Sequence, residues 1–174
     1  MKTLYFLRHA KSDWNNFDLS DHGRPLNARG QRACAKIGRM LVTRGFSPDR
    51  VLCSSAVRAR ETLDRVMVAA ECTWPVTFEP KLYGASADSI LSLIRQQSDA
   101  ADSLFLVGHN PGFQDIVVGL TGNEKSEGTL ARVIRKMPTA GFAELSFDTD
   151  SFKSIGVGKG CLVDFFKPKD KTIV

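Results

Sequence analysis

Short apolar runs alternate with amphipathic segments over the first two thirds of the chain, a pattern typical of an α/β protein with a parallel sheet. The apolar runs that we expect to form buried strands are Thr3–Leu7, Val51–Cys53, Val76–Phe78 and Ser103–Val107. The segments between them carry apolar side chains at helical spacing. They predict helices over about Asn27–Arg44, about Val57–Ala70, Asp88–Gln97, and from Gly112 to about Leu120.

The first predicted helix has recognisable ends. Asn27 has the side chain of an N-cap, and Gly45 lies where the residue after a C-cap belongs. A polar, irregular loop over Lys11–Pro25 separates this helix from the first strand.

The last third of the chain changes character, because strand-like runs follow one another without intervening helices. These runs are Leu130–Ile134, Phe142–Phe147 and Cys161–Phe166, preceded by a polar loop over Thr121–Gly128. They would add antiparallel members to the sheet. We therefore predict a three-layer α/β/α sandwich around a mostly parallel, mixed sheet, with residues 1–174 forming a single domain.

Composition fits this picture. The chain has 174 residues, of which 43% are hydrophobic and 25% charged, as in a globular domain with a substantial core. No run approaches the roughly 18 apolar residues of a membrane helix, and the N-terminal run is too short for a signal peptide. We therefore expect a cytoplasmic location. The cysteines form no C-x-x-C pair and are expected to be buried free thiols: Cys34, Cys53, Cys72 and Cys161.

The formal net charge of +5 is moderate, and the basic residues are spread along the chain. Lys167, Lys169 and Lys171 form a small basic tail that we expect to be solvated. A basic surface attracts phosphorylated or acidic substrates. It supports nucleic-acid binding only weakly, so neither a nucleic acid nor a membrane is expected as a partner.

Side chains that can bind phosphate follow three of the predicted strands. They are Arg8 and His9 after the first strand, Ser54, Ser55 and Arg58 after the second, and His109, Asn110 and Gly112 after the fourth. The carboxyl ends of parallel strands share one edge of a sheet, where ligands bind in open α/β folds. Histidine can act as a nucleophile, and arginine matches phosphate oxygens with a rigid fork of donors. Read alone, Arg8-His9 is equally compatible with an ordinary surface dipeptide.

Three motifs resemble the histidine phosphatase superfamily, which includes the cofactor-dependent phosphoglycerate mutases. They are Leu7-Arg8-His9-Ala10-Lys11-Ser12-Asp13-Trp14-Asn15, Ser55-Ala56-Val57-Arg58-Ala59-Arg60-Glu61-Thr62 and Val107-Gly108-His109-Asn110-Pro111. Ala10 and Lys11 replace the Gly and Glu of the mutase signature. This variant and the Asp21…Arg24-Pro25-Leu26…Arg29-Gly30 stretch are most similar to the small bacterial phosphohistidine phosphatases.

The resemblance implies a phosphoglycerate mutase-like fold and a role for each matching residue. His9 would be the nucleophile, Arg8 and Arg58 would bind the phosphoryl oxygens, and His109 would donate a hydrogen bond from the opposite side. Asn15 and Ser55 are weaker candidates for the same pocket. His9 must be neutral to attack, so the nearby guanidinium groups should keep its pKa from rising. Neither a metal nor a cofactor is implied.

One departure from the larger relatives bears on the substrate. They carry a general acid on an inserted helical segment, whereas Glu79–Ser86 leaves little room for an insertion. Glu79, Asp18 or Asp21 could still serve as the acid. An imidazole leaves more easily than an alkoxide, so a missing acid favours a phosphoramidate such as phosphohistidine.

The resemblance therefore implies a phosphohistidine phosphatase that acts on a signalling protein, such as a histidine-containing phosphotransfer domain. A small-molecule phosphomonoesterase of the same superfamily and a phosphoprotein-binding module without turnover remain alternatives. Outside the pocket, we expect Trp14 to pack against its own loop. Lys11 is either a plain exposed lysine or a residue that steers an acidic protein. We expect the remaining polar residues of interest to be exposed, namely His22, Arg60 and Arg65.

Overall fold

One mixed β-sheet forms the centre of the protein. The structure is a computed structural model that describes residues 1–122 and 127–170. The described residues form a six-stranded sheet in the order β3-β2-β4-β1-β5-β6. The strands are β1 (Lys2–Arg8), β2 (Arg50–Ser54), β3 (Val76–Glu79), β4 (Ser103–Gly108), β5 (Phe142–Phe147) and β6 (Cys161–Phe166). β1 to β4 are parallel, whereas β5 and β6 are antiparallel additions. The predicted mixed sheet is confirmed.

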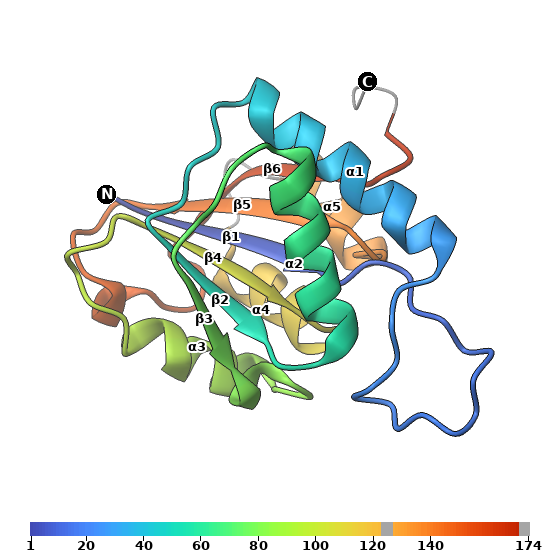
Figure 1. Cartoon of the computed structure of the whole chain (residues 1–174). Helices are drawn as coiled ribbons and strands as arrows, with labels where there is room; N and C mark the ends of the chain where they lie inside the picture. Colours follow the sequence, from blue (N-terminus) through green and yellow to red (C-terminus); the bar gives the residue numbers. More distant parts are fainter. Residues whose placement is uncertain (123–126, 171–174) are drawn as a thin grey trace.

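Helices cover both faces of this sheet, which makes the three predicted layers (Figure 1). α1 (Ala28–Thr43) and α2 (Val57–Ala69) lie on one face. The other face carries α3 (Ala87–Arg95), α4 (Gly112–Leu120) and α5 (Glu127–Arg135). Two short 3₁₀ turns, η1 (Pro80–Leu82) and η2 (Phe152–Ser154), complete the described elements.

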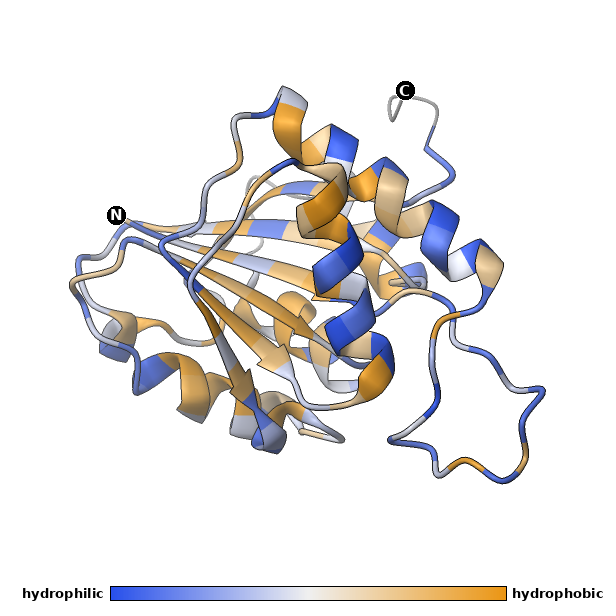
Figure 2. Cartoon of the chain, viewed as in Figure 1, coloured by the Kyte–Doolittle hydropathy of each residue, from blue (hydrophilic) through white to orange (hydrophobic). Residues whose placement is uncertain are grey.

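The strands are apolar on both faces because each face belongs to a separate core. In β4, Leu104 and Leu106 pack against the core under α3, α4 and α5, whereas Phe105 and Val107 pack against the core under α1 and α2. This follows from the two-residue period of a strand. Figure 2 shows the strands as mostly hydrophobic and the helices as two-sided. The continuous apolar runs of the sequence are thus explained by burial on both faces.

α1 begins and ends as its sequence predicts. The Asn27 side chain accepts a hydrogen bond from the Gly30 amide at 2.9 Å, and Gly45 has a φ of 61°, which favours glycine. Gly30 is required for a second reason, because a Cβ there would lie 2.2 Å from the Lys11 carbonyl oxygen. The start of α1 is therefore pressed against the chain just after β1.

The strand predicted over Leu130–Ile134 is wrong, because this segment lies in α5. Val133 and Met137 are fully buried and Leu130 is half-buried, while Ile134 is 55% exposed. The buried positions follow a spacing of three and four residues, so burial on one side selects a helix. The predicted polar loop over Thr121–Gly128 ends where α5 begins, and its residues 123–126 lie outside the described residues.

Two predictions about side-chain burial need correction. Cys34 and Cys53 are buried free thiols as expected, but Cys72 and Cys161 are only half-buried. Lys167 of the predicted solvated tail is also half-buried, and Lys171 lies outside the described residues. Within the described residues, no helix is both long and apolar enough to cross a membrane.

Candidate active site

The ends of β1, β2 and β4 bring His9, Ser54 and His109 to one edge of the sheet. Parallel pairing sets Arg8 opposite Gly108 and Cys53 opposite Val107, so the residues that follow lie side by side. The His9 and His109 rings are 5.0 Å apart between centroids. Arg58, in the first turn of α2, places its Nε 3.3 Å from His9 Nε2. Each of His9, Arg58 and His109 is more than 90% buried.

Hydrogen bonds fix the orientation and tautomer of His9. Its Nδ1 lies 2.7 Å from the Ala10 carbonyl oxygen, which can only accept, so Nδ1 carries the proton. In the neutral ring, Nε2 therefore keeps its lone pair, which accepts a hydrogen bond from Arg58 Nε. That lone pair faces Arg58 and is the group of this site best suited to attack an electrophile.

Thr62 joins the loop that carries His9 to α2. Its Oγ1 accepts a hydrogen bond from the Ala10 amide at 2.9 Å and donates to the Arg58 carbonyl oxygen at 2.6 Å. Thr62 is fully buried. One hydroxyl thus links the main chain just after His9 to the main chain of Arg58, and so fixes the two residues relative to each other.

Thr62→Val should therefore destabilise the protein, because it keeps the shape and leaves the buried Ala10 amide without an acceptor. We expect a loss of about 1–3 kcal/mol in the free energy of unfolding, measured with urea. Thr121→Val is the matched control, since Thr121 is also buried and donates to a carbonyl four residues earlier, but its hydroxyl accepts no described hydrogen bond. Equal losses in the two variants would contradict the positioning role of Thr62.

Arg8 is held by the segment that precedes β5. Its Nη1 donates to the Met137 carbonyl oxygen at 2.9 Å, and Asn110 Nδ2 donates to the same oxygen at 3.0 Å. Arg8 Nε is buried and has no acceptor among the described residues. Met137 was absent from the residues singled out in the sequence, because its contribution is a main-chain carbonyl that side-chain motifs do not reveal.

His109 is oriented by Ser54, the last residue of β2. The Ser54 hydroxyl oxygen lies 2.7 Å from His109 Nε2 and accepts from the Ala56 amide at 3.4 Å. When the serine proton is donated to Nε2, the proton of the neutral imidazole lies on Nδ1. His109 Nδ1 is buried without an acceptor among the described residues. It is a second N–H donor that a bound oxyanion could satisfy.

Asp21 accepts hydrogen bonds from both Nη atoms of the Arg58 guanidinium group. Its carboxylate lies 3.0 Å from Arg58 Nη2, and its main-chain carbonyl accepts from Nη1. The same carboxylate accepts from Arg24 Nη2 and from the Tyr83 hydroxyl. The Tyr83 hydrogen bond, and then the two arginines, hold the pKa of Asp21 well below its ordinary range. Asp21 is thus an ionised partner of Arg58, and its suggested role as a general acid is not supported.

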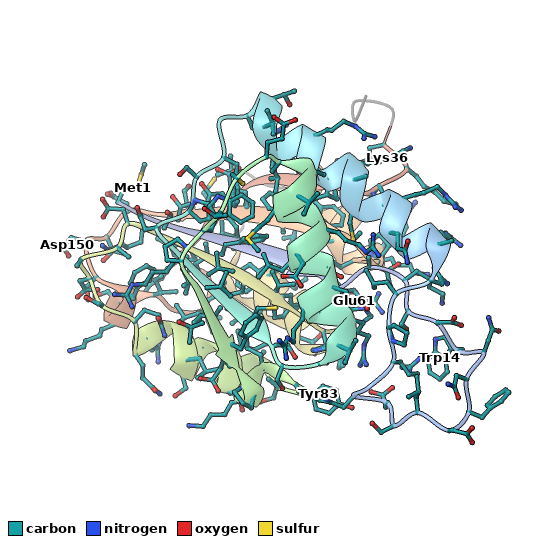
Figure 3. The ribbon with its side chains drawn as sticks, in the orientation of Figure 1. Met1, Trp14, Lys36, Glu61, Tyr83 and Asp150 are labelled. Carbon is teal, nitrogen blue, oxygen red and sulfur yellow. The ribbon has the colours of Figure 1, made fainter. Side chains whose placement is uncertain are left out.

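Tyr83 and His22 form the outer rim of the site. Figure 3 shows Tyr83 beside the loop that carries Trp14. The Tyr83 ring lies edge-on to His22 and to His109, with centroids 4.9 and 5.4 Å apart. His22 is half-buried rather than exposed as predicted, since its Nε2 lies 2.9 Å from Ser55 Oγ. Ser55 therefore reaches the rim through His22, and it is Ser54 that contacts His109.

Two of the other candidates lie on a loop outside the site. Asn15 and Asp18 are exposed on the loop that projects from the body of the protein (Figure 1). Glu79 lies opposite Ser54 in the β2–β3 pair, but its carboxylate accepts a hydrogen bond from the Lys81 amide and caps η1. Trp14 is 61% exposed, with the Arg24 guanidinium 3.4 Å from its ring centre, so it packs against its loop on one side only. Arg60 and Arg65 are exposed as predicted.

Burial makes both histidines difficult to protonate. Burial is the main cause, and together with the Arg58 and Arg8 guanidinium groups it lowers the pKa of His9 to about 4. Burial and the neighbouring His9 lower the pKa of His109 to about 3. The sequence predicted that the guanidinium groups keep the pKa of His9 from rising. Removal of the ring from water lowers this pKa more than the guanidinium groups do. Both rings are neutral at pH 7, as a nucleophile and a neutral donor require.

The low pKa of His9 should make stability depend on pH. An unfolded histidine takes up a proton near pH 6.5, whereas folded His9 stays neutral down to about pH 4. The unfolded state therefore binds more protons in this window, and stability falls as the pH drops from 6.5 towards 4. Urea unfolding at pH 7 and pH 5 should show a smaller difference in His9→Gln than in the unmodified protein. An equal difference would contradict a lowered pKa.

Comparison with known proteins bears on the class of this site. The family model of the histidine phosphatase superfamily (branch 1) matches residues 4–98. An uncharacterised protein of Mycobacterium leprae is 35% identical over 143 residues, which are 80% of this chain and 86% of the relative. Within the described residues, no group of three or more His, Cys, Asp or Glu side chains is placed to hold a metal ion.

Two solved structures have the same fold over nearly the whole chain. A candidate phosphohistidine phosphatase, SixA, of Agrobacterium tumefaciens superposes with a TM-score of 0.81 at 30% identity, covering 96% of this chain and 98% of that one. A candidate SixA of Nakamurella multipartitia gives a TM-score of 0.81 at 26% identity, covering 97% of each chain.

Proposed function

This chain belongs to the histidine phosphatase superfamily (branch 1), and we propose that it removes phosphate from phosphohistidine on a protein, with His9 as the nucleophile. Residues 1–174 would act as one histidine phosphatase domain. The observation that carries the proposal is the His9 ring itself. Its Nδ1 proton is held by the Ala10 carbonyl, its Nε2 lone pair accepts from Arg58 Nε, and its ring centroid lies 5.0 Å from that of His109.

In the first step, the Nε2 lone pair of His9 attacks phosphorus. A P–N bond to His9 forms while the P–N bond to the substrate imidazole breaks. The bonding electrons and a proton from solvent go to the departing ring nitrogen. Because the pKa of His9 is about 4, its lone pair is available throughout the neutral range.

Charge on the phosphoryl oxygens would be stabilised by donors that are already in place. Arg8 Nε and His109 Nδ1 are buried nitrogens without hydrogen-bond partners among the described residues, and Arg58 donates to Nε2 of His9. Nδ1 of His109 is a donor in the tautomer that takes the Ser54 proton on Nε2. A buried donor left unpaired costs about 1–3 kcal/mol, so a phosphoryl group would relieve that cost as it binds. Fixed donors of this kind are the main source of catalysis in phosphoryl transfer.

In the second step, water attacks phosphorus and gives up a proton to solvent, while the bond to His9 Nε2 breaks and its electron pair returns to Nε2. Inorganic phosphate leaves, and His9 returns to its neutral form. The net reaction consumes one water and gives free histidine and phosphate, so it requires no other reactant. His109 and the two arginines would serve both steps, because the oxygens stay bound while the two axial groups exchange.

The choice of phosphohistidine rests on the leaving group. The one carboxylate described in contact with the catalytic arginines is Asp21, and its pKa is lowered. A carboxylate that stays ionised has no proton to give to an alkoxide. An imidazole needs less help, and the solved structure that is 30% identical is a candidate phosphohistidine phosphatase.

A substrate comparison tests this choice. We expect kcat/KM for a phosphohistidine-bearing phosphotransfer domain, or for phosphoramidate, to exceed that for sugar phosphates and phosphoserine by at least about 100-fold. The protein and the assay for released phosphate stay the same throughout. Preference for sugar phosphates would instead identify a small-molecule phosphomonoesterase, and phosphate binding without turnover of any substrate would identify a binding module.

A further inference from the structure

A second hollow opens beside the candidate active site, at the end of the sheet where β6 stops. Its volume is about 590 Å³, within the range of about 300–1,000 Å³ that small-molecule sites occupy. The walls come from the start of α1, the segment before β5 and the segment after β6, with Lys11 beside them. None of these segments is adjacent to another in the sequence.

Basic side chains dominate the walls of this hollow. α1 contributes Arg29, Arg32 and Lys36, whose spacing of three and four residues puts them on one face of the helix. Figure 3 shows Lys36 projecting from α1. Like charges at this spacing repel each other, and positive charge near a helix N-terminus is unfavourable. The first turn of α1 also has no acidic residue to offset them.

The opposite walls add further positive charge. Lys136 comes from the segment before β5, and Lys167 and Lys169 follow β6. In the part of the chain that the structure describes, none of the basic residues lining the hollow has a carboxylate oxygen within 4.0 Å. The nearby Asp170 pairs with Arg132, which does not line the hollow. The hollow therefore concentrates positive charge that the described residues leave unpaired.

Hydrogen bonds and prolines hold the backbone around the hollow in place. Asp170 closes a turn on Lys167, with the Lys167 amide donating to Asp170 Oδ2 at 3.0 Å and the Asp170 amide donating to the Lys167 carbonyl at 2.9 Å. Pro138 and Pro168 supply rigid wall. The lysine and arginine heads would therefore meet a ligand from a fixed backbone.

The strand order gives the separation between the end of β6, beside the hollow, and the end of β1, just before His9. β6 is two strands from β1, and both end at the same edge, so their ends are about 10 Å apart. The two sites also share a link, because Arg8 donates to the carbonyl of Met137, which lies between Lys136 and Pro138 in sequence.

We propose that this hollow is a second anion-binding site, and that its ligand is a compact polyphosphate chain, either free or attached to a nucleoside. Arginine forks match phosphate oxygens in pairs, and a chain of phosphates brings several negative charges into one small volume. The carboxylates of a folded protein are spread over a wider, convex surface. The proposal goes beyond the phosphatase function and does not rest on it.

Titration calorimetry with inorganic triphosphate tests the proposal on the full chain at low salt. The unmodified protein and Arg58→Ala should bind it equally within about twofold, because Arg58, which the proposed active site uses to hold phosphate, lies outside the hollow. Arg32→Glu/Lys36→Glu should weaken binding at least about tenfold, since it removes two charge-assisted contacts. Arg39→Glu/Arg50→Glu is the matched control, because it makes the same change in net charge at exposed positions outside the hollow and should retain most of the affinity.

Further titrations distinguish a nucleotide from inorganic polyphosphate, and some outcomes would contradict the proposed site. A nucleoside triphosphate that binds more tightly than inorganic triphosphate points to a nucleotide, and the reverse points to inorganic polyphosphate; either supports the site. Equal weakening in both double variants, or loss of binding in Arg58→Ala, would overturn it. Tighter binding of a polyglutamate peptide than of triphosphate would also overturn it, in favour of an acidic protein.

Discussion

Replacing His9 by alanine is expected to abolish turnover of phosphohistidine, with kcat falling by about 10⁴-fold or more. Removal of a nucleophile typically has this size of effect, because the donors around it cannot form the covalent bond. Phosphate binding should survive, since Arg8, Arg58 and His109 do not depend on the His9 side chain for their main-chain positions. The measurement is single-turnover release of phosphate, together with a binding titration.

His9→Ala should also fold at least as well as the unmodified protein at pH 5. It removes a buried ring that resists protonation, whose pKa is about 4. A near-UV spectrum and an unfolding curve separate loss of chemistry from loss of structure. Full turnover by a folded His9→Ala would contradict the assignment of the nucleophile.

Arg58→Ala is expected to reduce kcat by about 10²- to 10³-fold, the usual effect of removing one donor from a charge-stabilising site. Its Nε is 3.3 Å from His9 Nε2, so the guanidinium lies next to the nitrogen to which the phosphoryl group would bond. The loss should fall on kcat more than on KM, since the donor acts most strongly as negative charge develops. Kinetics on phosphoramidate would measure both constants.

Two further variants serve as controls for Arg58→Ala. Arg60→Ala removes an exposed arginine of the same helix and should leave kcat within about twofold. Arg58→Lys keeps the charge but loses the fork and should recover only part of the activity. If Arg60→Ala were as damaging as Arg58→Ala, the effect would arise from helix charge and not from contact with phosphate.

The sequence predicts the centre of the site well and its surroundings poorly. Arg8, His9 and His109 could be placed because each follows an apolar strand, and parallel strands end at one edge. Asp21 and Tyr83 could not, because their contact depends on the path of two irregular loops. Such paths follow from tertiary contacts and not from any periodicity along the chain.

Tertiary contacts also explain why the sequence analysis predicted a strand where α5 lies and did not predict the basic hollow. Leu130–Ile134 fits a short strand in isolation, and its helical form becomes evident only from which of its side chains are buried. Arg32 and Lys167 are far apart in sequence, and they line one hollow because β5 and β6 turn back so that β6 ends beside α1. The predicted scattering of charge was therefore true of the sequence but not of the surface.

The measurement that tests the central claim most directly is detection of a phosphoryl group on His9 during turnover. The protein is mixed with a phosphohistidine-bearing domain, quenched in alkali within one turnover, and digested for mass spectrometry. The account predicts a modification that is stable in alkali and lost in acid, on the peptide that contains His9 and absent from His9→Ala. A label on another residue, or unchanged turnover by His9→Ala with no label, would contradict it.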